Sequence, residues 1–249
     1  MLPVLYFVAP EAWGNLSQFL PHILVAALLA MLSQWTRFLA LKALPVGVSS
    51  AATTGFNVLL AVLFSGLYFQ EWLSAYELIF LILVALGAVS LSCNRGDKMQ
   101  HLEIVSWWRG CSLVVLTSLF LTAAFAILTE VAREFDPFLS AYLWESLIAV
   151  WTIVFIAARR VMGGEGLEGV SVGKWLCILR DSAPTLLGTV GFMMAVQLES
   201  LALAAGVSTL TVVIMTGLSV WLYGEKLRLW QYGAIGLTLV GVAGLRLMG

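Results

Sequence analysis

The sequence predicts an all-α, polytopic membrane protein with about eight transmembrane helices. Hydrophobic residues make up 61% of the 249 residues and charged residues only 11%, with a mean hydropathy of +0.98. A soluble domain carries about 25% charged residues, so this chain has too few to cover a surface in water. Its apolar runs also lack the period-two alternation of membrane barrel strands. Helices are therefore the predicted spanning elements.

The length of the apolar runs places the individual spans. A helix needs roughly 20 apolar residues to cross the hydrocarbon core of a bilayer. The predicted spans lie near 22–44, 51–70, 74–93, 111–131, 138–158, 183–204, 207–223 and 230–248. The connections at 44–50, 69–74 and 223–228 are tight, and those at 94–110 and 159–180 are longer. Short turns between consecutive spans predict antiparallel neighbours in a bundle.

Charge and composition exclude several function classes. The net charge of −1 offers no basic surface for nucleic acid. The three cysteines form no CxxC pair, so neither a disulfide framework nor a metal site is expected. His22 and His101 stand alone near predicted membrane edges, and no HExxH or other paired catalytic group is present. We expect no enzyme and no cofactor; the expected partners are the lipid bilayer and a small-molecule substrate, and a homo-oligomer stays open.

The cationic residues predict an orientation through the positive-inside rule. Successive loops lie on alternate sides of the membrane. The first side carries ten cationic residues: Lys42, Arg95, Lys98, Arg109, Arg159, Arg160, Lys174, Arg180, Lys226 and Arg228. The second side carries only Arg133 and Arg246. This bias would place the first side in the cytoplasm and both chain ends outside.

A helix–acidic turn–helix segment occurs twice. Sliding residues 67–91 forward by 154 positions pairs Glu71 with Glu225 and Gly87 with Gly241. Five predicted spans separate the two turns, and an odd number makes the two units point in opposite directions across the membrane. Inverted repeats of this kind give many secondary transporters their two mirrored states. We interpret the glutamates of the turns as interfacial rather than catalytic.

Two longer segments resemble a known family. ALPVGVSSAATTGFNVLLAVLFSGLYFQEWLSAYELIFLILVALGAVSL resembles the last three helices of an EamA-type repeat of the drug/metabolite transporter superfamily. The segment 111–248 resembles a complete five-helix repeat. Both contain a small-residue step ALxxGV (Ala43–Val48 and Ala202–Val207), then an apolar helix, an ExL turn and a glycine-bearing last helix. The resemblance implies two inverted, EamA-like repeats, the first of them incomplete.

The resemblance also implies a domain organisation. We expect an N-terminal segment at 1–21, a partial first repeat of three helices at 22–93, a loop at 94–110 and a second repeat of five helices at 111–249. The family fold has ten helices, so the first two of the family pattern are missing. The chain is either an N-terminally truncated gene product or a reduced member that completes its bundle by association. The family's usual orientation puts the C-terminus in the cytoplasm, against the charge bias, so the orientation is left open.

The function that the resemblance implies is secondary-active transport of a small organic metabolite by alternating access. Amino acids, amines and nucleoside- or sugar-like solutes are the candidate classes. A phosphate ester would require several cations within the spans, and only one arginine lies there. No phosphate-binding loop for ATP is present. The alternative is a non-transporting membrane scaffold or a truncated transporter fragment.

Polar side chains within the first two spans are candidates for substrate binding, because polar groups are costly in lipid. Gln34 and Arg37 lie three residues apart and share a helix face; Arg37 either lines a cavity or snorkels to the interface. Thr53, Thr54 and Asn57 share a face of the second span. The hydroxyls have a structural alternative, since they can bond to their own backbone, but Asn57 does not.

The later spans supply three further candidates. Gln197 and Glu199, taken as part of one helix, are two residues apart and face different directions. Glu199 is an ionisable group in an apolar run and a candidate for proton coupling or for an ion pair with Arg37. Such a pair predicts non-additive effects of mutating both residues. Thr211 aligns with the polar side chains of the second span and is predicted to face the same cavity.

Overall fold

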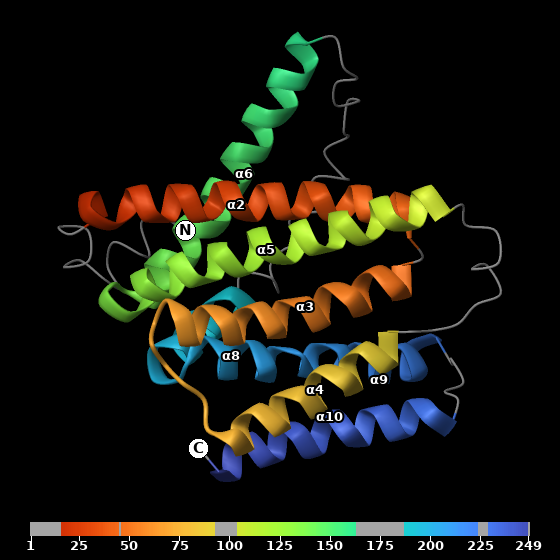
Figure 1. Ribbon diagram of the computed structural model, residues 1–249. Helices are drawn as coiled ribbons and strands as arrows, with labels where there is room; N and C mark the ends of the chain where they lie inside the picture. The colour runs from red at the N-terminus through yellow and green to blue at the C-terminus, as the bar shows by residue number, and fades with distance from the viewer. Residues whose placement is uncertain (1–15, 45, 93–103, 163–186, 224–228, 249) are drawn as a thin grey trace. The chain divides into compact units, whose positions relative to one another are not determined.

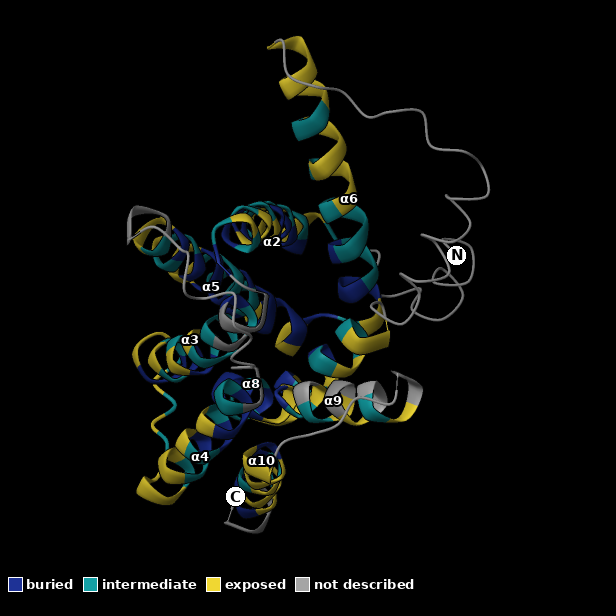
Figure 2. Ribbon diagram, turned by 90° about the vertical axis from the view of Figure 1, so that its right-hand side faces the viewer, coloured by how far each residue is buried: buried dark blue, intermediate teal, exposed yellow. Residues whose placement is uncertain are grey.

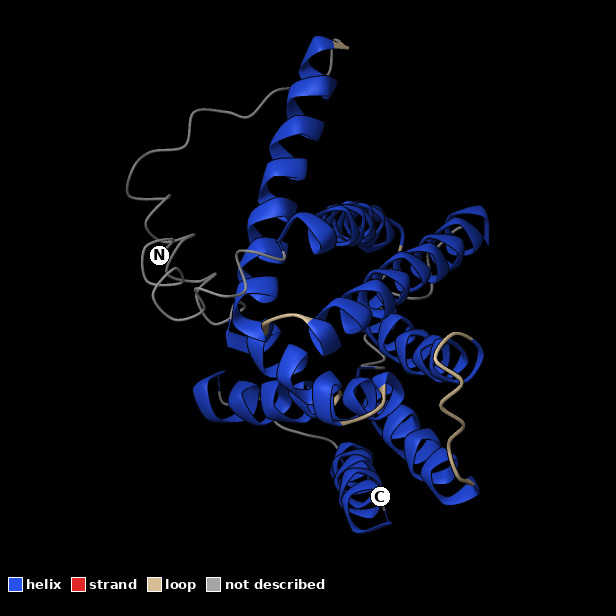
Figure 3. Ribbon diagram, turned by 90° about the vertical axis from the view of Figure 1, so that its left-hand side faces the viewer, coloured by secondary structure: helices blue, strands red, loops and turns tan. Residues whose placement is uncertain are grey.

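The structure, a computed structural model, describes residues 16–44, 46–92, 104–162, 187–223 and 229–248. Within these residues it contains helices and connecting segments and no strand, which confirms the all-α prediction (Figure 3). The helices are α2 (Leu16–Ala43), α3 (Val46–Leu67), α4 (Ala75–Ser92), α5 (Ile104–Glu134), α6 (Pro137–Val161), a helix at Leu187–Leu198, α8 (Leu201–Ser208), α9 (Leu210–Tyr223) and α10 (Leu229–Met248) (Figure 1).

Several predicted segments lie partly outside the described residues. These are residues 1–15 of the N-terminal segment, 94–103 of the first long loop, 163–180 of the second, 183–186 of the predicted sixth span and the turn that contains Glu225.

The lengths and composition of the helices fit membrane spans. Among the described residues, three helices are long and apolar enough to cross a bilayer: Leu16–Ala43, Trp107–Glu134 and Pro137–Val161. The shorter apolar helices are Ala52–Leu67, Ala75–Ser90, Leu187–Leu198 and Leu229–Leu245. Ala52–Leu67, Ala75–Ser90 and Leu187–Leu198 fall within the spans expected from hydropathy, and the other four segments overlap their expected spans and extend beyond them by one to six residues at one or both ends.

The predicted sixth span at 183–204 is wrong in its last third, because the helix ends at Leu198. Glu199 and Ser200 are not helical. Ser200 has an extended backbone (φ −64°, ψ 152°), and its hydroxyl accepts a hydrogen bond from the Leu203 amide at 3.2 Å, so it caps the start of α8. Gln197 and Glu199 therefore do not share a helix, and the premise that they face different directions of one helix fails.

Other boundaries also differ from the prediction. α2 begins at Leu16, within the expected N-terminal segment 1–21, and α5 begins at Ile104, within the expected loop 94–110. The stretch 46–50 belongs to α3 rather than to a turn; its glycine and serines suggested a turn, but a helix end tolerates them at small cost. The predicted seventh span is divided, because α8 ends at Ser208 and α9 begins at Leu210. Thr209 lies between them, and its hydroxyl and amide both donate to the Gly206 carbonyl. A three-residue bond of this kind tightens the last turn of a helix.

The chain forms two compact units. Unit 1 contains the described residues up to Met31 together with Ile127–Leu198, and unit 2 contains Leu32–Ala126 and Glu199–Gly249. Helices α2 and α5 each contribute residues to both. These units follow contacts in space and do not coincide with the repeats that the sequence predicts, so the repeat boundaries stay a prediction.

Unit 1 is held together around the start of α6. Asp136 caps this helix by accepting the Leu139 amide at 2.7 Å, and Pro137 occupies its first turn. The buried residues of α6 are confined to its first part, at 139–144, and its second half is largely exposed (Figure 2). The Trp151 indole donates to the Leu24 carbonyl at 3.1 Å and so joins α6 to α2.

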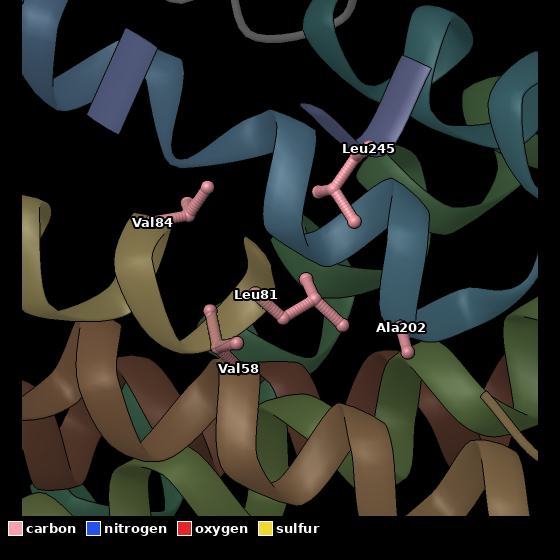
Figure 4. Close-up of a cluster of buried hydrophobic side chains, with 5 residues drawn as sticks. All are labelled: Val58, Leu81, Val84, Ala202 and Leu245. Carbon is pink, nitrogen blue, oxygen red and sulfur yellow. The ribbon is translucent and has the colours of Figure 1, made fainter. Parts of the chain in front are cut away.

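Unit 2 has an apolar core made by four helices. Val58 of α3, Leu81 and Val84 of α4, Ala202 of α8 and Leu245 of α10 are all buried there (Figure 4). In Figure 4, Leu81 projects from α4 between Val58 and Ala202. Burial of such a side chain stabilises the fold by about 1.5–3 kcal/mol, so this cluster fixes the positions of α3 and α4.

The contact between α4 and α10 is reciprocal under the 154-residue shift. A Cβ atom added at Gly87 would lie 2.2 Å from Thr238 Oγ1 and 2.8 Å from the Ala234 carbonyl. A Cβ added at Gly241 would lie 2.6 Å from Val84 Cγ2 and 2.9 Å from the carbonyl of Phe80. Val84 and Phe80 are the residues that the shift places on Thr238 and Ala234. Gly87 therefore meets two residues of α10, and Gly241 meets the two residues of α4 that occupy the equivalent repeat positions.

The reciprocal contacts of Gly87 and Gly241 define how α4 and α10 are related by symmetry. Later positions on α4 meet earlier positions on α10, so the two helices are antiparallel, as Figure 1 also shows. A two-fold axis perpendicular to both helices produces such a self-complementary contact. An axis of that direction relates inverted repeats in transporters, and the contact is the one that the inverted-repeat prediction requires.

Candidate functional site

A polar stripe follows one face of α3. Ser50, Thr53, Thr54 and Asn57 have the spacing i, i+3, i+4 and i+7, which places their side chains on one helix face. All four are half-buried. Thr54 and Asn57 are thus brought together as the sequence predicted, in the company of Thr53.

A different face of α3 is apolar and exposed. Phe56, Leu59 and Leu63 have exposed fractions of 39%, 54% and 53%. Exposed leucine and phenylalanine side chains along a spanning helix are suited to contact with lipid. The polar stripe lies away from these residues, so α3 presents lipid with its apolar side.

The two threonines of the stripe satisfy their hydroxyl protons within the helix. Thr53 Oγ1 donates to the Ser49 carbonyl at 2.8 Å, and Thr54 Oγ1 donates to the Ser50 carbonyl at 2.9 Å. These are the bonds to the preceding turn that serine and threonine form in helices. The structural alternative considered for the hydroxyls is thus realised, and only their oxygen lone pairs remain for another partner.

Asn57 differs from the threonines. Its Oδ1 atom is buried and accepts no hydrogen bond. Leaving a buried acceptor unsatisfied costs about 1–3 kcal/mol, and the large majority of buried polar side-chain atoms in proteins have a partner. Among the candidate residues, Asn57 therefore carries a buried side-chain oxygen that still lacks a hydrogen-bond donor.

Buried hydroxyls that the sequence analysis missed join α2 to α5, and one of them joins α5 to the stripe. Thr117 Oγ1 of α5 lies 2.9 Å from Thr36 Oγ1 of α2, and Ser33 of α2 donates to the Thr117 carbonyl at 3.0 Å. Ser118 of α5 donates to the Thr53 carbonyl at 3.3 Å and so reaches the stripe. All four hydroxyl residues are buried. The sequence signal for these residues was that hydroxyl side chains occur in pairs within apolar runs, at Ser33 and Thr36 and at Thr117 and Ser118.

Gln197 has a structural role in unit 1. Its Nε2 atom donates to the carbonyls of Ala132 and Phe135, which belong to the last turn of α5 and the residue that follows it. Arg133 returns the contact by donating from Nε to the Val196 carbonyl at 3.1 Å. Each helix thereby satisfies carbonyls that the other leaves without a helical partner.

The remaining candidates lie on exposed surfaces. Gln34 and Arg37 are exposed on α2, Glu199 is exposed between two helices, and Thr211 is exposed near the start of α9. Their participation in a substrate site, and the pairing of Arg37 with Glu199, stay predictions. Among the described residues, no three or more histidine, cysteine, aspartate or glutamate side chains are grouped so that they could hold a metal ion.

Comparison with known proteins agrees with this architecture. Residues 108–247 match the family model described as the EamA-like transporter family. This range nearly coincides with the segment that the sequence identified as similar to a complete repeat. No curated protein matches the chain. One solved crystal structure aligns with 99% of this chain and 97% of its own, at 14% sequence identity and a TM-score of 0.65, which supports the fold.

Proposed function

Since the chain belongs to the EamA-like transporter family and is a multi-pass integral membrane protein, we propose that it moves a small organic solute across the membrane by alternating access. Asn57 and the polar stripe of α3 form part of the substrate site. The energy comes from a solute or ion gradient, because the sequence contains no loop suited to ATP phosphates.

The unsatisfied Oδ1 atom of Asn57 carries this proposal. In a lipid-embedded protein, an uncompensated polar group costs several kcal/mol, so its retention needs a compensating use. A solute that brings a hydrogen-bond donor supplies the missing partner. The site is then unsatisfied when empty and satisfied when loaded.

The position of Asn57 along α3 supports a role in binding. α3 runs from Val46 to Leu67, so 11 residues precede Asn57 and 10 follow it. At about 1.5 Å per residue, this places Asn57 near the centre of a hydrocarbon core about 30 Å thick. Transporters with inverted repeats bind their substrates near that depth.

The antiparallel contact of α4 and α10 supports the alternating mechanism. Because the contact is self-complementary, exchanging the conformations of two repeats leaves it formed. Gly87 and Gly241 keep the backbones close at this point. We propose that this contact is preserved while the surrounding helices change their arrangement.

The test combines ligand binding with the stability of two variants. The purified chain in detergent is screened by thermal shift against amino acids, amines, nucleosides and sugars, because a ligand that binds the folded state raises the melting midpoint. Asn57→Leu replaces the amide with an apolar side chain of similar size. It is expected to raise the midpoint of the empty protein and to abolish the ligand-dependent shift.

A matched control separates binding from packing. Leu59→Ala alters the exposed face of the same helix and is expected to keep the ligand-dependent shift. If Asn57 has a structural role instead, Asn57→Leu will lower the midpoint of the empty protein. A folded wild-type protein that responds to no solute class would favour a membrane scaffold over a transporter.

A further inference from the structure

The oxygens of Thr53, Thr54 and Asn57 give the stripe on α3 three hydrogen-bond acceptors for a ligand. A hydroxyl group has one proton and two lone pairs, and Thr53 and Thr54 both spend the proton on carbonyls of α3. Their oxygens can therefore only accept from a ligand. Asn57 adds the buried Oδ1 atom, which also lacks a donor.

The same helix face becomes apolar beyond Asn57. Leu60, Ala61 and Phe64 follow at i+3, i+4 and i+7 and continue the face toward the C-terminus of α3. Leu60 and Phe64 are half-buried, unlike the exposed Leu63 beside them. The face thus has an acceptor half and an apolar half, and the seven residues from Asn57 to Phe64 span about 10 Å.

We infer that the solute is a primary amine, whose N–H donors form its polar head, and that its apolar body is about 10 Å long or shorter. This inference rests on the proposed function and narrows its substrate class. An amine presents two or three donors to the oxygens of Thr53, Thr54 and Asn57, and its hydrocarbon part lies along Leu60 and Phe64. A carboxylate head would gain no donor from the threonines, and among these three residues only the Nδ2 group of Asn57 could donate to it.

Matched probes on the wild-type chain test the chemistry of the head. The melting midpoint is measured with 2-phenylethylamine, with its N,N,N-trimethylated derivative and with 3-phenylpropionate. The trimethylated compound keeps the charge and the aromatic body but has no N–H donor. The primary amine is expected to stabilise the protein most, and its apparent affinity is expected to be at least about tenfold higher than that of either analogue. This comparison requires no variant to fold.

Variants of α3 then test which part of the solute binds to the acceptor half of the helix face and which part binds to the apolar half. Asn57→Leu is expected to weaken binding of 2-phenylethylamine at least about tenfold, whereas Leu63→Ala on the exposed face leaves it unchanged. Because the probe enters detergent equally with either variant, the comparison isolates the site. Phe64→Ala is expected to weaken binding of 2-phenylethylamine and to leave the weaker binding of ethylamine, which lacks the aromatic body, unchanged.

Three outcomes would overturn the inference. Equal stabilisation by the trimethylated compound would remove the role of N–H donors, and stronger stabilisation by 3-phenylpropionate would reverse the polarity of the site. An Asn57-dependent shift with a sugar or a nucleoside but not with the amine would refute the amine while leaving the proposed function intact. If no probe or pool gives an Asn57-dependent shift, both proposals fail.

Discussion

The tightest packing between α4 and α10 predicts a large effect from a small substitution. In Gly87→Ala, the new methyl group would lie 2.2 Å from Thr238 Oγ1, 2.8 Å from the Ala234 carbonyl and 2.9 Å from the Thr238 amide nitrogen. Two of these three atoms belong to the backbone of α10, and Thr238 Oγ1 is bonded to the Ala234 carbonyl at 3.0 Å. The methyl group therefore fits only if the helices separate.

The expected loss of stability follows from two opposing terms. Overpacking a close contact costs typically about 1–3 kcal/mol, and a contact with backbone atoms places this case near the upper end. Alanine regains up to about 1 kcal/mol over glycine through helix propensity. The net destabilisation is about 2 kcal/mol, which corresponds to a decrease of about 4–8 °C in the melting midpoint for a protein of this size.

Tryptophan fluorescence during thermal unfolding in detergent measures this change. Gly236→Ala is the matched control, because it lies on α10 and a Cβ there meets nothing within 4 Å. This control is expected to keep or raise the midpoint. Gly241→Ala is expected to lower it as Gly87→Ala does, through Val84 Cγ2 at 2.6 Å and the Phe80 carbonyl at 2.9 Å. A midpoint for Gly87→Ala at or above that of the wild type would refute the close antiparallel contact.

Three further substitutions test the assignments in each unit by the same thermal assay. Gln197→Leu is expected to lower the midpoint by removing the bonds to the end of α5 while leaving ligand-dependent shifts intact; a lost shift would restore Gln197 to the substrate site. Asp136→Ala is expected to cost about 1 kcal/mol, since it removes the acceptor of the Leu139 amide at the start of α6, and an unchanged midpoint would contradict the cap. Thr117→Val is expected to cost about 0.6 kcal/mol, the average for a hydrogen bond between membrane helices, and a cost above about 2 kcal/mol would give the hydroxyl pair with Thr36 a larger role.

Hydropathy located the spans of this chain because a bilayer imposes a minimum apolar length, and its boundaries were most accurate for α4 and α10. The predicted spans at 74–93 and 230–248 differ by at most one residue at either end from α4 (Ala75–Ser92) and α10 (Leu229–Met248). The break at Glu199 and Ser200 escaped the same analysis. A serine within an apolar run has the same hydropathy whether it is inside a helix or caps one, and only its extended backbone distinguishes the cap.

The candidate site was predictable to the extent that side-chain chemistry is local. The hydroxyls of Thr53 and Thr54 can donate hydrogen bonds to carbonyls of α3, and they do so. The Oδ1 atom of Asn57 finds no hydrogen-bond donor within the helix. Gln197 was indistinguishable from a ligand-binding amide in the sequence, because its acceptors are backbone carbonyls from a distant segment. The 154-residue shift, in contrast, pairs Gly87 with Gly241 from the sequence alone, and these two glycines make reciprocal contacts in the structure.

Transport by reconstituted protein tests the central claim most directly. The solute with the largest Asn57-dependent stabilisation is added in labelled form to proteoliposomes that contain the wild-type chain, Asn57→Leu or Leu59→Ala. Saturable uptake by the wild type and by Leu59→Ala, absent from an Asn57→Leu protein that is at least as stable as the wild type, is the predicted result. Equal uptake by all three would show that Asn57 does not bind the solute, and no uptake by any of them would contradict the assignment of transport to this chain.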